Sequence, residues 1–255
     1  MLGSRVVECL GSGGVEALTL SRGGRPGTVR GDLLTGEGLD RAVEGVDTIV
    51  HCASNPFRKS RQTDVGGTER LLGAAARTGV SHVIYISIVG IDRAQSYPYY
   101  RVKLETEHVI ENSPVPHTIL RATQFHDFVL GMVRLLEKPP VMLVPRGFLG
   151  QSVDVGEVAA RLVELALSEP AGRAPDMGGP EVRTLAGAAR AYLGVTGRRR
   201  RIFEVPVPGK TARAFREGAL ICPDGTHGSV SWEEFLRERW NPATGRIPSA
   251  YDRIE

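Results

Sequence analysis

The chain has 255 residues, of which 41% are hydrophobic, 24% charged and 6% aromatic. This composition excludes a disordered, collagen-like or coiled-coil chain, and the length allows one large α/β domain. The 32 basic and 29 acidic residues leave a net charge of only +3, so we expect no nucleic-acid partner.

The cysteine, histidine and apolar patterns indicate a reducing compartment without a metal or a membrane. Cys9, Cys52 and Cys222 form no CxxC pair, and the six histidines form no HExxH pair. These spacings exclude a disulfide framework and predict no metal site. No apolar stretch approaches the roughly 18 residues of a membrane helix, and the start of the chain lacks the apolar core of a secretory signal. We therefore expect a cytoplasmic protein with no membrane partner, as a monomer or a homodimer.

Short apolar runs alternate with helical patterns over the first two thirds of the chain. A helix is expected over residues 2–10, and a short strand ends just before Gly31. The other predicted elements are the strands Val15–Leu20, Asp47–Cys52, Val83–Ile88 and His117–Arg121 and the helices Asp64–Thr78 and Tyr99–Glu111. Such alternation is typical of βαβ units, and near-continuous apolar strands are typical of a sheet covered on both faces. We therefore predict an α/β fold with a doubly wound parallel sheet.

The last third of the chain has shorter elements, separated by prolines. Its predicted helices run from Asp154 to Leu167, with Glu157 in the N-cap arrangement, from Thr184 to Leu193, and from Ser231-x-x-Glu234 to near Trp240. We predict a single domain over residues 1–255, with a core over about residues 1–150. A small lobe over about residues 151–255 would pack on the carboxyl edge of the sheet.

Ligands of open parallel sheets bind outside the carboxyl ends of the strands. The residues that follow the first three predicted strands are Ser21 and Arg22, Asp32 and Leu33, and Ala53 and Ser54. Arg22 offers a cation to the 2′-phosphate of NADP at the place where a carboxylate would bind the ribose of NAD; a solvated arginine in a turn is the alternative. Asp32 and Leu33 are placed beside an adenine, and the small Ala53 and Ser54 permit a close approach of the cofactor.

Ser87, Tyr99 and Lys103 form a second candidate group. Ser87 lies at the end of an apolar strand, and Tyr99 and Lys103 share one face of the following helix because they are four residues apart. A neighbouring cation lowers the pKa of a tyrosine hydroxyl, which then exchanges a proton near neutral pH. A serine hydroxyl can hold a substrate carbonyl. A YxxxK pair is common by chance, but its place directly after this strand predicts a proton-transfer site.

Seven stretches together resemble a known family in its order, over roughly residues 1–190. They are Ser21-Arg22, Gly31-Asp32-Leu33, Asp64 to Thr68, Tyr85 to Gly90, Tyr99 to Lys103, Leu120 to Phe125 and Val153 to Ala159. The chain resembles an atypical short-chain dehydrogenase/reductase of the NmrA-like, NAD(P)H-binding kind. The resemblance implies a Rossmann-like fold, with Lys103 on the nicotinamide ribose and Tyr99 and Ser87 as proton-transfer partners. It also places Thr123, Gln124 and Phe125 near the nicotinamide and the substrate.

The chain departs from this family at its start. The family begins with a strand and a TGxxGxxG turn, whose glycines let the backbone approach a pyrophosphate. Here Gly3 resembles the last glycine of that turn, and the strand and the earlier glycines are absent. Residues 11–14 are no replacement, because they precede a strand instead of following one. Either the true start lies upstream, or the protein is a family member that lost this strand. We expect a strand-wide gap between Val15–Leu20 and Asp47–Cys52.

Together these features predict an NADP-linked oxidoreductase that reduces a small carbonyl-type substrate. Two alternatives remain open. One is a non-catalytic NADP(H)-binding sensor or regulator, since NmrA-like proteins include such cases. The other is a nucleotide-sugar epimerase, which Asp64-Val65-x-Gly67-Thr68 favours.

Several other features have plain structural explanations. His126 and Asp127 at a helix start are interpreted as packing or capping residues, and the run Arg198–Arg201 as a solvated turn. Cys52 is expected to behave as a small hydrophobic residue. Trp232, Phe235 and Trp240, at helical spacing, are interpreted as core or subunit contacts.

Overall fold

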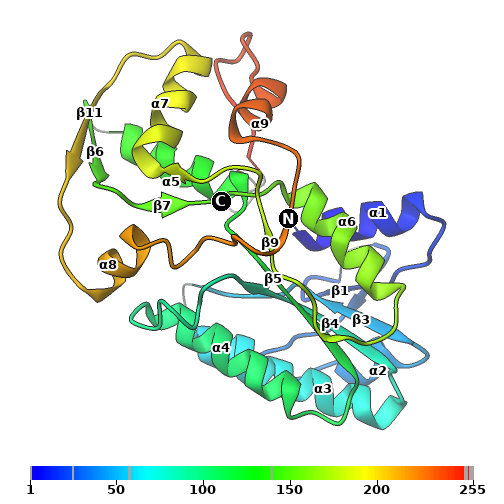
Figure 1. Ribbon diagram of the computed structural model, residues 1–255. Coiled ribbons are helices and arrows are strands. Elements are labelled where there is room, and N and C mark those ends of the chain that lie inside the picture. The colour runs from blue at the N-terminus through cyan, green and yellow to red at the C-terminus, as the bar shows by residue number, and fades with distance from the viewer. Residues whose placement is uncertain (1, 25, 57–58, 139, 250–251, 253–255) are drawn as a thin grey trace.

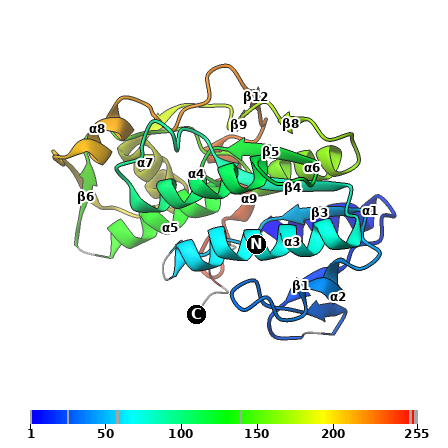
Figure 2. The same ribbon diagram turned by 90° about the horizontal axis from the view of Figure 1, so that it is seen from below.

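The main sheet of the protein is parallel and has helices on both faces (Figures 1 and 2). The computed structural model describes every residue except 1, 25, 57–58, 139, 250–251 and 253–255. The strands of the sheet, in spatial order, are β12 (Thr226–His227), β9 (Met177–Gly178), β5 (His117–Ala122), β4 (His82–Ile88) and β3 (Thr48–His51), with β8 (Gly172–Arg173) also on β5. All their pairings are parallel.

Alternation along β4 explains the two layers of helices. Ile84 and Ile86 pack against α1 (Leu2–Ser12) and α6 (Val155–Ala166) on one face. Val83 and Tyr85 point to the other face, which is covered by α2 (Leu39–Val43), α3 (Gly66–Thr78) and α4 (Pro98–Glu111). Since successive side chains of a strand point to opposite faces, a strand that is apolar throughout is stable only between two layers.

Two further strands form a separate small sheet. β1 (Thr19–Ser21) pairs in parallel with β2 (Thr28–Arg30). Among the described residues β1 makes no pairing with β3, which lies at the edge of the main sheet. β1 and β2 thus form a sheet of their own in the described part of the chain, and the width of the predicted gap stays a prediction. β1 is shorter than predicted, because only the three residues opposite β2 have a partner strand.

The remaining elements form a second body around its own apolar core. They are α5 (His126–Glu137), β6 (Val141–Pro145), β7 (Leu149–Gly150), β10 (Arg183–Thr184), α7 (Leu185–Thr196), β11 (Arg201–Val205), α8 (Lys210–Arg216) and α9 (Trp232–Arg239). β11 pairs in parallel with β6, and β10 pairs antiparallel with β7. Trp232 and Phe235 are almost fully buried in this core. The two bodies interleave along the chain, since α5 precedes residue 150 and α6 follows it.

Two helix starts have the predicted caps. The Asp154 carboxylate accepts hydrogen bonds from the backbone N–H groups of Gly156 and Glu157 at 2.7 and 3.4 Å and so caps α6. Ser231 and Glu234 form a reciprocal capping box at α9. The predicted helix Asp64–Thr78 differs from the expectation, because it begins with a π-helical turn, η1 (Arg61–Val65), before α3. None of the described helices is long and apolar enough to cross a membrane. The fold is Rossmann-like α/β, as predicted.

Candidate active site

Tyr99 lies in the first turn of α4, directly after Pro98 at the helix start. Its hydroxyl forms a hydrogen bond with the hydroxyl of Ser54, which follows the end of β3. Ser54 in turn donates to the Asp64 carboxylate at 2.7 Å, and the backbone N–H of Asn55 donates to the other oxygen of Asp64 at 2.9 Å. Two predicted residues, Tyr99 and Ser54, are therefore in contact. The buried Asp64, which Ser54 joins to Tyr99, was not predicted as a site residue.

Lys103 lies one turn further along α4 and is almost fully buried. Its Nζ donates to the hydroxyl of Tyr85 at 2.6 Å and to the carbonyl of Ile86 at 2.8 Å. Burial lowers the pKa of Lys103 to about 8, and the negative charges of Asp64 and Glu107 oppose that shift. The amine thus binds the carboxyl half of β4, and no hydrogen bond joins it to Tyr99 among the described residues.

Ser87 is buried at the end of β4, on the face of the sheet that α4 covers. Its hydroxyl makes no hydrogen bond of good geometry within the described part of the chain, although it lies close enough to Glu107 to affect that carboxyl group. Burial would raise the pKa of Glu107, but hydrogen bonds from Arg121, with smaller contributions from Ser87 and Arg173, lower it.

A buried ion network holds α4 against β5. The Arg121 guanidinium donates to both oxygens of Glu107 at 2.9 and 2.7 Å, and Arg173 donates to Glu107 at 3.1 Å. Arg121 also donates to Asp92, in the loop between β4 and α4, at 3.1 Å. The network fixes the helix that carries Tyr99 and Lys103. Sequence reasoning missed it, because isolated charges are usually solvated.

Thr123, Gln124 and Phe125 follow β5 with their backbones held in place. Thr123 donates its N–H to Met177, and the Gln124 carbonyl accepts from Val153 at 3.0 Å, next to a bridge between Phe125 and Val153. The Thr123 hydroxyl and the Gln124 Nε2 are buried without a hydrogen-bond partner in the described structure. Buried polar atoms are normally paired. These two atoms therefore fit a polar ligand at the carboxyl end of β5.

The predicted adenosine end lies on the small β1–β2 sheet. Ser21 ends β1, and Arg22 is exposed in the following loop. Asp32 accepts a hydrogen bond from the N–H of Leu34 at 2.8 Å, so its carboxylate also shapes its own turn. Leu33 is buried, with its carbonyl accepting from Arg70 at 3.1 Å.

Gly3 and Ala53 lie where helix α1 meets the end of β3. A Cβ added at Gly3 would come 3.8 Å from the Cβ of Cys52, which is an ordinary contact distance. Ala53 is exposed beside Cys52. Burial raises the pKa of the Cys52 thiol to about 12, as expected for a hydrophobic role. Residues 11–14 end α1, and Gly14 has a φ of 71°, so they form a helix C-terminus and no phosphate turn.

His126 is a core residue. It is fully buried, its ring nitrogens lie 2.8 Å from the Ser152 hydroxyl and 3.0 Å from the Val230 carbonyl, and Trp232 and Phe235 pack on it. Burial lowers its pKa, so the packing interpretation is supported.

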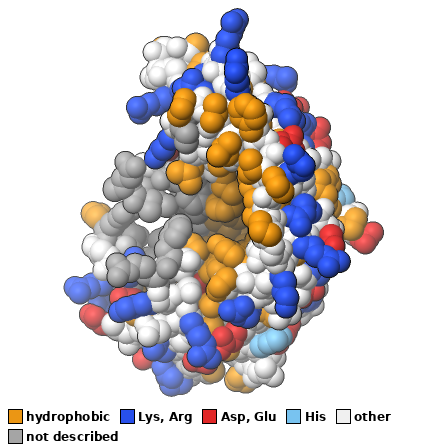
Figure 3. Space-filling view, turned by 90° about the vertical axis from the view of Figure 1, so that its left-hand side faces the viewer, with side chains coloured by type: hydrophobic (Ala, Val, Ile, Leu, Met, Phe, Trp, Pro, Cys, Tyr) orange, Lys and Arg blue, Asp and Glu red, His pale blue; other side chains and the backbone are white. Residues whose placement is uncertain are grey.

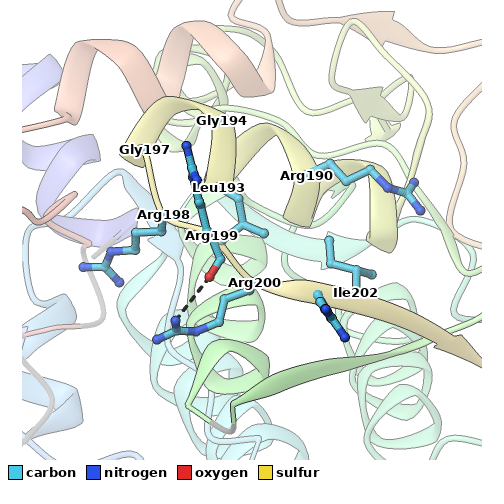
Figure 4. Close-up of a pocket in the computed structure, with 9 residues that line it drawn as sticks. Arg190, Leu193, Gly194, Gly197, Arg198, Arg199, Arg200 and Ile202 are labelled. Carbon is cyan, nitrogen blue, oxygen red and sulfur yellow. Dashed lines mark hydrogen bonds between the residues drawn. The ribbon is translucent and has the colours of Figure 1, made fainter.

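A pocket between α7 and β11 is lined by the arginine run (Figure 4). Arg198 donates to Glu137 at 2.7 Å, and Arg190 donates to Glu204 at 2.8 Å. Arg200 donates to the carbonyl of Arg199 at 3.3 Å. Part of the cluster is thus used in ion pairs between elements of the second body, and none of it comes from the strand ends that carry Tyr99 and Ser87.

Figure 3 shows an apolar hollow on the face that carries β6, β11 and α8. Leu143 of β6 and Phe203 of β11 are cross-strand neighbours and half exposed. Tyr97, which precedes α4, is also exposed. The small sheet of β6 and β11 therefore presents apolar side chains to solvent on this face.

Comparisons with known proteins identify the family and the fold of the chain. A family model described as NAD(P)H-binding matches residues 15–169. A (4-alkanoyl-5-oxo-2,5-dihydrofuran-3-yl)methyl phosphate reductase of Streptomyces griseus is 28% identical over 215 residues, which cover 75% of this chain and 71% of the relative. The photosystem II assembly factor Ycf39 of Trieres chinensis is 22% identical over 157 residues, so the match covers 59% of this chain and about half, 49%, of that relative.

A solved structure shares the fold. The NADPH-dependent quinone oxidoreductase QOR2 of Escherichia coli, complexed with NADPH, has a TM-score of 0.79 and 17% identity, covering 94% of this chain and 97% of that one. The chain has a Rossmann-like sheet, matches the family model over residues 15–169, and belongs to the NAD(P)H-binding family.

Proposed function

We propose that the protein is an NADP-linked reductase of a small, largely apolar carbonyl-type substrate. The observation that carries the proposal is the group of polar atoms at the strand ends. The Thr123 hydroxyl and the Gln124 Nε2, which follow β5, are buried without partners in the described structure. Ser87 lies near the end of the neighbouring strand β4, to which Lys103 of α4 is bonded. The similarity to a Streptomyces reductase supports the same reaction class.

The cofactor would lie across the carboxyl edge of the sheet. Arg22 would hold the 2′-phosphate of NADP, with Ser21, Asp32 and Leu33 around the adenosine. The start of α1 at Gly3 would face the pyrophosphate, and Ala53 and Ser54 would border its path. Thr123, Gln124 and Phe125 would line the nicotinamide end. When bound, the cofactor supplies a hydride.

The chain's own residues would supply the proton and the orientation. Tyr99 holds a proton on its hydroxyl and would give it to the substrate oxygen. Ser87 would donate a hydrogen bond to the substrate carbonyl. Lys103 would exchange its contacts with Tyr85 and Ile86 for the nicotinamide ribose, where its charge favours the ionised tyrosine. The three cysteines are free, which supports action in a reducing compartment such as the cytoplasm.

The test is NADPH oxidation with a panel of quinones, unsaturated lactones and aldehydes. Tyr99→Phe should abolish turnover and leave NADPH affinity unchanged, because only the hydroxyl is lost. Tyr97→Phe, two residues away and exposed, is the matched control and should keep full activity. Near-normal turnover by Tyr99→Phe would show that Tyr99 is structural.

A non-catalytic NADP(H)-binding protein is the second candidate. It is favoured by the contacts that engage Tyr99 with Ser54 and Lys103 with Tyr85 within the protein. Tight NADPH binding without oxidation by any compound of the panel would support this candidate over the reductase.

A further inference from the structure

Asp64 is a buried carboxylate whose two oxygens are both turned toward the candidate site. Its exposed fraction is 2%. One oxygen accepts from the Ser54 hydroxyl at 2.7 Å and the other from the Asn55 N–H at 2.9 Å. Because Ser54 also contacts the Tyr99 hydroxyl, three side chains form one continuous hydrogen-bonded chain.

Counting hydrogens fixes the direction of this chain. An ionised carboxylate only accepts, and a serine or tyrosine hydroxyl has one hydrogen to donate. Ser54 donates its hydrogen to Asp64, so Tyr99 must donate to Ser54. The Ser54 hydroxyl thus ties the Tyr99 oxygen to the buried carboxylate of Asp64 and limits where that oxygen can lie.

The position of Asp64 is held from several sides. It lies in the π-helical turn η1, and such turns occur frequently at functional sites. The Thr68 hydroxyl donates to the backbone carbonyl of Asp64, and the Nε2 of His51 lies 2.9 Å from that hydroxyl. Strand β3 and helix α3 thus both fix the carboxylate relative to Ser54.

We propose that Asp64 is a positioning residue that acts through Ser54 and holds the Tyr99 hydroxyl in place for proton transfer. The proposal rests on the proposed role of Tyr99. In reduction, the proton on Tyr99 passes to the substrate oxygen as the substrate carbon takes up the hydride of NADPH. The ionised Tyr99 then takes its next proton from solvent. Oxidation runs through the same transfers in reverse.

The test uses two double-mutant cycles on the full chain, with Asp64→Asn, Ser54→Ala and Tyr99→Phe. The first cycle measures the free energy of unfolding in urea and requires no turnover. If the chain of hydroxyls exists, Tyr99→Phe destabilises the wild type and has little effect in the Ser54→Ala background. Additive effects of these two substitutions would overturn the proposal.

The second cycle measures kcat for reduction. Asp64→Asn should lower kcat between about tenfold and 100-fold when Tyr99 is present, and it should have no further effect on the residual rate of Tyr99→Phe. An equal loss in both backgrounds would mean that Asp64 is only structural. Asp40→Asn, which removes an exposed carboxylate paired with Arg77, is the matched control and should change neither cycle.

The two proposals fail in different ways. A protein that binds NADPH and reduces nothing overturns the proposed function. The stability cycle still tests the hydroxyl chain in that case, because it measures the coupling energy between Ser54 and Tyr99 without any turnover. A protein that reduces its substrate with no coupling in either cycle overturns only the role of Asp64.

Discussion

Lys103 is a buried lysine of the candidate active site. Burial lowers its pKa to about 8, against the opposing effects of Asp64, Glu107 and Cys52. The amine therefore loses its proton within the range where most assays are run. A lysine on an exposed helix face would stay charged at every pH of interest.

We predict that NADPH binding weakens as the pH rises through about 8, because a neutral Lys103 no longer attracts the cofactor. In Lys103→Met, binding should be weak and should not change in this range.

The free energy of unfolding should change with pH in the opposite direction. The folded pKa lies below the usual 10.5, so the unfolded state binds more protons between the two values and stability rises with pH across that window. Cofactor titrations and urea unfolding over the same pH range check both signs; unchanged affinity well above pH 8 would contradict the role of Lys103.

Arg22 provides the test of cofactor choice. It is exposed in the loop after β1, and we predict that Arg22→Ala weakens NADP binding by about 1 to 3 kcal/mol, the range for a lost charge-assisted contact, and leaves NAD binding nearly unchanged. Arg41→Ala, at an exposed position of α2, is the control and should alter neither affinity. Calorimetric titration of both cofactors measures the difference. Equal affinity of the unmutated protein for NAD and NADP would refute the preference.

At the level of elements, the local sequence pattern predicted the helices and strands whose buried residues recur at regular spacing. β4 and α4 were predicted within a residue of their observed bounds, because an apolar run of strand length and a helical repeat each admit few alternatives. The placement of Tyr99 and Lys103 on α4 followed from those elements. The pairing of Arg121 with Glu107 could not be predicted, because no local sequence pattern distinguishes a buried ion pair from solvated charges. The contacts of Asp64 likewise depend on a π-helical turn that has no sequence signature.

Gly90 joins the loop after β4 to the second body. Its φ is 76°, and an added Cβ would come 1.6 Å from the carbonyl oxygen of Ala219. We predict that Gly90→Ala destabilises the protein by more than about 2 kcal/mol, because a strained φ and a backbone clash add together.

Gly131, inside α5, is the matched control for Gly90. An added Cβ there would meet nothing within 4 Å, so Gly131→Ala should stabilise the protein by about 0.5 to 1 kcal/mol. Urea unfolding of both variants gives the comparison. Equal effects of the two substitutions on the free energy of unfolding would mean that the loop after β4 can shift away from Ala219 without an energetic cost.

At the level of the whole molecule, the described strands form a main sheet and a separate pair, β1 and β2. β1 pairs only with β2, and β3 only with β4, in the part of the chain that is described. The three residues before His51 on β3 are half-buried, whereas six of the seven residues of β4 are buried. Helix α1 still packs its apolar face, Leu2, Val6 and Leu10, against α6. The edge of β3 and the edge of β1 thus each have backbone groups that a further strand would pair.

We predict that a variant extended at its start by a β-strand and a TGxxGxxG turn is more stable and binds NADPH more tightly than residues 1–255. A strand between β1 and β3 would pair both edges, and each buried backbone group left without a partner costs about 1 to 3 kcal/mol. Several such groups are a large part of a typical stability of about 5 to 15 kcal/mol. The added glycines would also let the backbone approach the pyrophosphate at the start of α1, which now has only Gly3. A Gly/Ser extension of equal length is the control, because it adds residues without a paired strand. The measurements are urea unfolding and NADPH titration of the three proteins. If the chain of 255 residues unfolds at the same urea concentration and binds NADPH as tightly as the strand-extended form, Gly3 is not the last glycine of a phosphate turn.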